Sequence, residues 1–196
     1  MTELLKGGWM MLPLAICSLI SVTVIIERWL FFRRIGKNAA AETVLELVQL
    51  GRVKDGLNLA KSSTLPLLKV LAAGMANPAE PTKAMESVGI TQYSIMKKGL
   101  STLDTIVTLA PLLGLLGTIL GMMDSFHIMA TVGGGGGSPH AVTGGVAEAL
   151  IATATGIGVA VTTLIPYNYF TARVERESEM IEHYATQLEM ALTEQE

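Results

Sequence analysis

Long runs of apolar residues alternate with polar stretches along this chain. Three runs, at residues 7–26, 105–123 and 149–172, approach or exceed the ~20 apolar residues that a helix needs to cross the hydrocarbon of a bilayer. None of the three contains a charged residue, although Glu148 directly precedes the third. No strand-like alternation appears between them. The pattern therefore predicts an all-α, polytopic membrane protein with three transmembrane helices.

The first run differs from a secretory signal peptide. Only Lys6 precedes it as a cation, the apolar stretch is too long, and no small-residue cleavage site follows. A lipoprotein cleavage box fits poorly, because Ile16 stands before Cys17 where a small residue is needed. We interpret the run as a membrane span, with Cys17, the only cysteine, as a buried structural thiol.

The polar stretch after the first run has the pattern of short helices. Segments 39–50, 53–62 and 65–75 show helical spacing, and prolines at 78 and 81 then break the chain. No helix-breaking residue is expected between Thr82 and Pro111, so one helix should continue from Thr82 into the second span. The third span should likewise continue past Arg173 to Thr193. Both spans are thus expected to extend into the cytoplasm as long helices.

The basic residues predict the orientation. Of the 14 Lys and Arg, eleven lie between Arg28 and Lys98, two follow the third span, and only Lys6 precedes the first. Lys and Arg collect on the cytoplasmic flanks of spans. The expected segments are an outside N-terminus (1–6), a first transmembrane helix (7–32), a cytoplasmic helical region (33–104), a second transmembrane helix (105–131), a periplasmic Gly-rich loop (132–143), a third transmembrane helix (144–172) and a cytoplasmic C-terminal helix (173–196).

Composition agrees with a membrane protein and offers little for an enzyme. Half of the residues are hydrophobic, 16% are charged, and the mean hydropathy is +0.48. A net charge of −3 attracts no nucleic acid. The chain lacks the sequence patterns of zinc proteases and serine hydrolases and has no paired cysteines, so neither catalysis nor a cofactor or metal is expected.

Two further motifs can be interpreted either as sites of chemistry or as purely structural features. Five glycines at 133–137 lack the preceding strand and following Lys of a phosphate-binding loop, so a flexible outside hairpin is favoured. Asp124 and His127 are one helical turn apart and could seat a metal. Since no third ligand lies nearby, a capping pair at the membrane interface is favoured.

Glu148 is the residue that most suggests a function. A carboxylate within a span is energetically costly and normally faces a bundle interior or a water-filled path. On the same side of the helix fall Ala152, Thr155, Val159, Thr162 and Thr163, so a polar stripe is expected to run from Glu148 toward the cytoplasmic end. The alternative is that Glu148 only reaches the outer headgroups or bonds a neighbouring helix.

Small residues recur at three- and four-residue steps in spans two and three, which allows helices to approach closely in lipid. We interpret four as packing residues: Gly114, Gly117, Gly121 and Gly156. Thr118 lies among them, and its hydroxyl either bonds its own helix or lines a path. Because one monomer offers more small-residue surface than it can satisfy, we predict a homo-oligomer.

Two runs resemble signatures of the MotA/TolQ/ExbB proton channel family, in its three-span ExbB/TolQ branch. APLLGLLGTILGMMDSF at 110–126 resembles the second-span signature, and VAEALIATATG at 146–156 resembles the third. Tyr167-Asn168 and Glu27-Arg28 also fit. The family usually places a proline near the position of Thr162, whereas here Pro166 comes one turn later.

The resemblance implies a proton-channel or stator subunit of an inner-membrane motor of the ExbB–ExbD or TolQ–TolR type. Such a motor couples the proton motive force to work across the periplasm, in TonB-dependent uptake, Tol-Pal function or gliding. The implied polar pore residues are Glu148, Thr118 and Thr153. The implied assembly is a homopentamer around two single-span ExbD/TolR-like helices, each with a membrane Asp, that acts on a TonB/TolA-like periplasm-spanning protein.

Two other classes of function remain open beside the channel. The first is a non-conducting structural scaffold of a membrane complex, in which Glu148 serves helix packing. The second is a membrane enzyme, which the missing nucleophile and metal set disfavour. A neighbouring gene for a small single-span protein with a membrane Asp would favour the channel over the scaffold.

Overall fold

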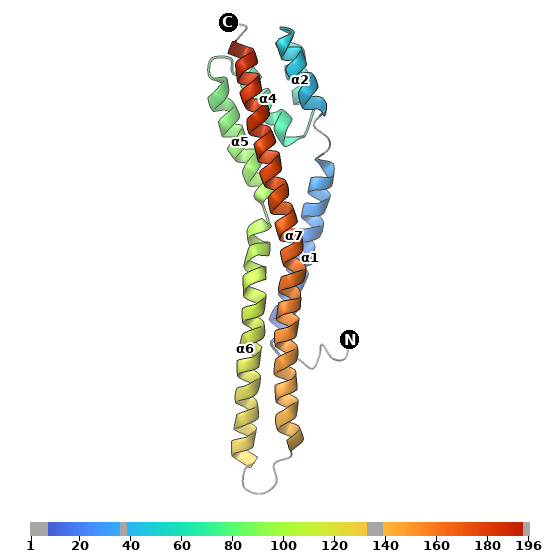
Figure 1. Cartoon of the computed structure of the whole chain (residues 1–196), viewed down its shortest axis with the longest axis vertical. Coiled ribbons are helices and arrows are strands. Elements are labelled where there is room, and N and C mark those ends of the chain that lie inside the picture. Colours follow the sequence, from blue (N-terminus) through green and yellow to red (C-terminus); the bar gives the residue numbers. More distant parts are fainter. Residues whose placement is uncertain (1–7, 36–38, 133–138, 194–196) are drawn as a thin grey trace. The chain divides into compact units, whose positions relative to one another are not determined.

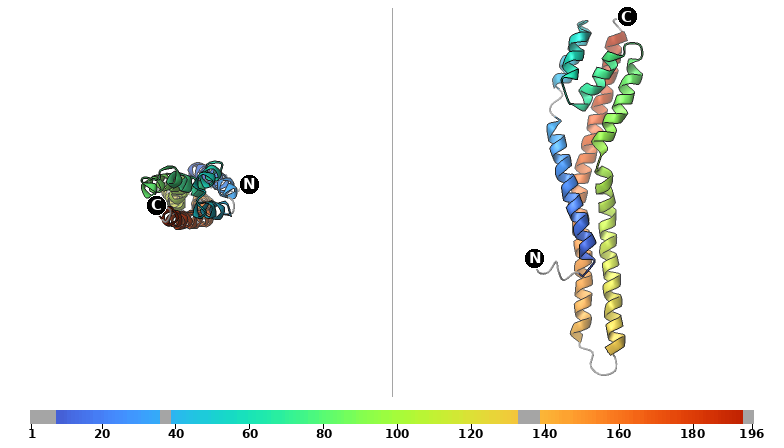
Figure 2. Two further views of the ribbon diagram at one scale, coloured as in Figure 1. Left: turned by 90° about the horizontal axis from the view of Figure 1, so that it is seen from above. Right: turned by 180° about the vertical axis from the view of Figure 1, so that it is seen from behind.

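The structure is a computed structural model that describes residues 8–35, 39–132 and 139–193, and these contain helices and no strands (Figures 1 and 2). The helices are α1 (Met11–Arg34), α2 (Ala39–Gln49), α3 (Val53–Lys61), α4 (Pro66–Ala76), α5 (Pro81–Lys97), α6 (Leu100–Val132) and α7 (Pro139–Thr193). Three stretches, Met11–Arg33, Pro81–His127 and Thr143–Thr193, are long and apolar enough to cross a membrane. The predicted all-α class with three candidate spans is confirmed. Residues 133–138 of the expected Gly-rich loop, including its five glycines, lie outside the described residues.

The chain divides into two compact units, to which α1 and α7 both contribute. One, here called the apolar unit, is Met1–Glu27 with Gly99–Asn168. The other, the charged unit, is Arg28–Lys98 with Tyr169–Glu196.

In the apolar unit, α1, α6 and α7 pack against one another. Leu14 and Cys17 of α1 are buried with Ile106 and Ala110 of α6, and Val159 of α7 packs against this cluster. Cys17 is therefore buried, as expected from its apolar surroundings. These contacts hold the three candidate spans together within one chain.

In the charged unit, α4 and α5 pack against each other, and α4 meets the second half of α7. A Cβ on Gly74 of α4 would lie 2.8 Å from Met85 Cγ of α5 and 3.3 Å from Leu188 Cδ2 of α7, so three helices meet closely there. On α7, Arg173 pairs with the buried Glu177 at 3.0 Å. Burial raises the pKa of the Glu177 carboxyl, and the positive charges of Arg173 and Arg176 oppose that rise.

The expected unbroken helix from Thr82 into the second span is wrong. α5 ends at Lys97, Lys98 leaves the helix with ψ 134°, and α6 begins at Leu100. Gly99 between them has φ 80°, in the left-handed region that glycine occupies without steric cost. Lysines in the last turn followed by glycine are a signal of a helix stop, although a glycine is also tolerated inside a helix. By contrast, α7 runs unbroken through Pro166.

Arg28 closes the end of α5 inside the charged unit. Its side chain is 3% exposed, and Nη1 donates to the carbonyls of Ile95 at 3.2 Å and Met96 at 3.3 Å. The guanidinium also lies 4.7 Å from the centre of the Phe31 ring. A cation at a helix C-terminus satisfies carbonyls that lack a partner within the helix.

We expect Arg28→Met to destabilise the charged unit by about 2 kcal/mol, because the carbonyls of Ile95 and the buried Met96 lose their charged donor. Thermal unfolding of the purified chain in detergent measures the effect. Arg33→Met is the matched control, since exposed Arg33 contacts only the Trp29 ring in the described structure, at 5.2 Å. Equal melting temperatures for the two variants would contradict the capping role.

Candidate functional site

Glu148 lies on α7 beside the turn that precedes α1. A Cβ added to Gly8 would collide with Glu148 Oε1, so the carboxylate lies directly against the backbone at Gly8. Gly8 has φ 70°, and both its conformation and this contact favour glycine. The turn at Gly8 thus forms one wall around Glu148, whose side chain is otherwise exposed.

A small hollow in the apolar unit contains both Glu148 and Asp124. Its volume is about 40 Å³, enough for a water molecule. The hollow is lined by the turn before α1, by α6 and by α7: Gly8, Trp9, Met10, Gly117, Leu120, Gly121, Asp124, Glu148 and Ala149. Two helices therefore present a carboxylate each to one hollow that can hold water.

Asp124 is the site residue that sequence reasoning missed. It was interpreted as half of a capping pair with His127. Yet Gly117, Gly121 and Asp124 follow one another at steps of four and three, so they share the face of α6 that meets α7. That spacing was visible in the sequence and would have placed Asp124 on the same side as Glu148.

Three of the four predicted threonines bond to their own helix. The hydroxyls of Thr118, Thr155 and Thr162 donate to the carbonyls of Leu115 at 2.6 Å, Ile151 at 2.8 Å and Gly158 at 2.8 Å. For Thr118, this is the first of the two alternatives left open by the sequence.

Thr153 differs, because its hydroxyl reaches the neighbouring helix. It donates to the carbonyl of Gly114 on α6 at 2.9 Å. This bond joins the two helices that carry Asp124 and Glu148, so Thr153 helps to set their relative position.

The residues of the expected polar stripe along α7 differ in burial. Ala152 and Thr163 are buried, whereas Thr162 is exposed. The Thr163 hydroxyl shares a 2.7 Å hydrogen bond with Ser21 of α1. One part of the stripe therefore contacts α1 inside the apolar unit, and another part is exposed.

The four predicted packing glycines lie where α6 meets α7. A Cβ on Gly156 would lie 2.5 Å from the carbonyl oxygen of Ala110, and a Cβ on Gly117 or Gly121 would lie 2.9 Å from the Cβ of Ala152 or Ala149. Gly114 likewise has its nearest contacts with the backbone of 152–153. These glycines bring together two helices of the same chain. Their close approach places the two carboxylates at one hollow.

Another small-residue face of α7 stays open. Ala154 and Gly158, four residues apart, are exposed, and a Cβ on Gly158 would meet no atom within 4 Å. Glycine and alanine at such a step allow a further helix to approach closely.

The model of the MotA/TolQ/ExbB proton channel family matches residues 58–183, which include all of α6 and most of α7. The chain belongs to the MotA/TolQ/ExbB family. Members are transport and channel proteins rather than enzymes. The resemblance of 110–126 and 146–156 to the family signatures is thereby confirmed, and Asp124, Glu148 and the four threonines all fall within the matched region.

Relatives in the MotA/TolQ/ExbB family extend the match over nearly the whole chain. An ExbB-like biopolymer transport protein (ExbB-like 3) of Synechocystis sp. is 33% identical over 192 residues, covering 95% of this chain and 91% of the relative. An ExbB homologue of Methanothermobacter thermautotrophicus is 30% identical over 184 residues, covering 90% and 64%. The Tol-Pal system protein TolQ of Pseudomonas aeruginosa is 42% identical over 80 residues, covering 41% and 34%.

Proposed function

We propose that this chain is the proton-conducting stator subunit of an inner-membrane motor of the ExbB–ExbD or TolQ–TolR type. The observation that carries the proposal is the hollow that Glu148 and Asp124 share between two candidate spans. Two carboxylates at a hollow large enough for a water molecule would give a proton successive resting places near one end of the spans. Proton flux into vesicles that contain the complex, with and without Glu148, tests the proposal.

The transported ion in this proposal is the proton, and no cofactor takes part. Protons pass between the Glu148 hollow and a membrane Asp on a single-span ExbD/TolR-like partner. Protonation of that Asp removes its charge and lets it move through apolar surroundings. The resulting motion of the partner relative to the stator is delivered to a TonB/TolA-like protein, as in nutrient uptake, the Tol-Pal system or gliding.

The proposed assembly is a homopentamer around two partner helices. The packing glycines no longer argue for it, because they are used within the chain. Support comes instead from the exposed Ala154–Gly158 face and from the exposed Glu148 side chain. A carboxylate facing hydrocarbon is costly, so protein or water is expected to cover Glu148 in the membrane.

We expect the N-terminus in the periplasm and residues 33–98 in the cytoplasm, because the basic residues gather in that region. Single cysteines at Thr2 and Ser138, in a Cys17→Ala background, should react with a membrane-impermeant thiol reagent in intact cells. A cysteine at Ser62 should react only after the cells are opened. Labelling at Ser62 in sealed cells would reverse the proposed topology.

A non-conducting scaffold is the second candidate, and one observation favours it. The hydroxyls of Thr118, Thr155 and Thr162 are bonded to their own helix carbonyls rather than directed to a shared path. In a scaffold, these residues and Glu148 serve only to pack helices. A substitution such as Glu148→Gln, which removes the titratable proton but keeps the side-chain volume, would then leave function intact.

A further inference from the structure

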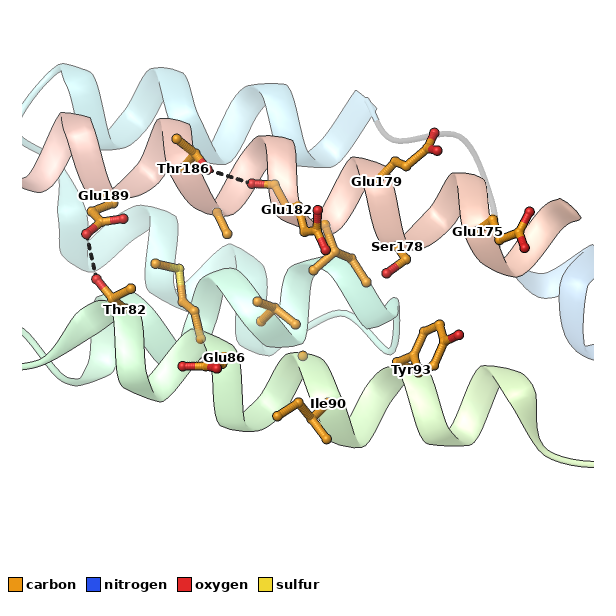
Figure 3. A pocket seen from close by; sticks show the side chains of 15 residues that line it. Thr82, Glu86, Ile90, Tyr93, Glu175, Ser178, Glu179, Glu182, Thr186 and Glu189 are labelled. Carbon is orange, nitrogen blue, oxygen red and sulfur yellow. Dashed lines mark hydrogen bonds between the residues drawn. The ribbon is translucent and has the colours of Figure 1, made fainter. Parts of the chain in front are cut away.

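The charged unit contains an open groove between α5 and α7, with α4 beneath it (Figure 3). Its volume is about 830 Å³. The floor is apolar and includes Val70, Met85 and Ile181, while Ile90 on the α5 side remains 66% exposed. Tyr93, one turn further along α5, also lines the groove and is exposed. Neighbouring exposed apolar side chains beside an apolar floor form a surface that a partner can cover.

Glutamates from both helices line this groove: Glu86, Glu175, Glu179, Glu182 and Glu189 (Figure 3). Glu189 accepts a 2.7 Å hydrogen bond from Thr82. Among the residues that the structure describes, no Lys or Arg forms an ion pair with the other four. Lys83, the basic residue next to Thr82, pairs with Glu80 instead. An apolar floor with an acidic border fits an amphipathic helix that carries lysines.

The chain itself has such a helix in α3. Lys54, Leu57, Asn58 and Lys61 recur at helical steps of three and four, so they share one face. Both lysines are exposed, whereas Gly56 and Ala60 on the other side are buried. The two lysines are seven residues apart, as are Glu175 and Glu182, and each pair therefore spans about 10 Å along its helix.

We propose that α3 of one copy of this chain lies in the α5–α7 groove of a second copy. This inference rests on the homo-oligomeric part of the proposed function. Lys54 and Lys61 pair with Glu175 and Glu182, and Leu57 covers the apolar floor near Ile90. The contact joins two different surfaces, so it can repeat from copy to copy, and the copies form a ring when the rotation between them closes.

The chain's own α3 does not occupy the groove, because it is held elsewhere in the same unit. A Cβ on Gly56 would lie 3.4 Å from the carbonyl of Val44 on α2 and 3.5 Å from Met75 Sδ on α4. The lysine face of α3 points away from these contacts and is free to meet another copy.

Disulfide trapping between differently tagged copies tests the contact. One copy carries Asn58→Cys and the other Ile90→Cys, both in a Cys17→Ala background, and they are coexpressed with the native partner genes. We expect oxidation to produce a disulfide dimer that carries both tags. Thr91→Cys is the matched control for Ile90→Cys, because Thr91 is exposed on α5 but does not line the groove, and it should cross-link poorly.

Charge reversal gives the second arm of the test. Lys54→Glu with Lys61→Glu should reduce the disulfide yield by about tenfold, through loss of two ion pairs and gain of repulsion. Glu175→Lys with Glu182→Lys in the opposing copy should restore the yield. Rescue would support pairing between copies, whereas equal yields in all combinations would overturn it.

The mass of the native complex separates this inference from the proposed function. An intact homo-oligomer that yields no Asn58–Ile90 disulfide would overturn the docking contact and leave the oligomer proposal standing. A monomer in native membranes would overturn both. Cross-linking of Ile90→Cys only to a cysteine on the single-span partner would assign the groove to that partner and overturn docking between copies.

Discussion

Glu148→Gln should abolish proton-driven work while the complex still assembles. Glutamine nearly conserves the volume and hydrogen-bonding capacity of glutamate, so the contacts with Gly8 and the hollow are retained. It cannot release a proton, however, and the proton flux should fall by about 100-fold or more, as for other positioned acid–base groups. Flux into vesicles and complementation of a deletion strain measure the effect, with complex yield determined in parallel.

Two further variants make this experiment decisive. Glu148→Asp should retain part of the flux, because the carboxylate survives on a shorter side chain. Asp124→Asn should lower the flux without abolishing it, since one of the two carboxylates at the hollow remains. If Glu148→Gln assembles and works at the wild-type level, and only Glu148→Leu disturbs assembly, the chain is a scaffold and not a channel.

Gly156→Ala should destabilise the apolar unit by about 2 kcal/mol, within the usual cost of overpacking a close contact. The added Cβ would lie 2.5 Å from the Ala110 carbonyl oxygen and 3.1 Å from Gly114 Cα. Both obstacles are backbone atoms, which cannot rotate away as a side chain can. The helices α6 and α7 must therefore separate, and the Asp124–Glu148 hollow should open with them.

Gly158→Ala is the matched control, two residues along the same helix. A Cβ there meets nothing within 4 Å, so the gain in helix propensity should leave stability unchanged or slightly raised. Thermal unfolding of the monomeric chain in detergent, in which the Ala154–Gly158 face is uncovered, compares the two variants. Equal stability of Gly156→Ala and Gly158→Ala would show that α6 and α7 do not pack through Gly156.

The three candidate spans and the short helices followed from the sequence because they depend on local properties. The length of a span can be counted along one apolar run of the sequence. The short segments predicted at 39–50, 53–62 and 65–75 each end within one residue of the ends of α2, α3 and α4. Gly51 follows the end of α2, and Pro78 follows the end of α4. The break at Gly99 was missed because a glycine after two lysines fits both a helix interior and a helix stop.

Contacts between helices required the tertiary structure. Periodicity identified the glycine face of the second span but not which helix covers it. In the structure, Gly117 and Gly121 of this face meet α7 of the same chain. Asp124 was paired with His127 by proximity in sequence, yet it shares a hollow with Glu148 of another helix. A helix pattern defines a face, whereas the rotation and register of one helix against its neighbour decide what that face touches. That physical difference separates what the sequence determined from what only the packed structure decided.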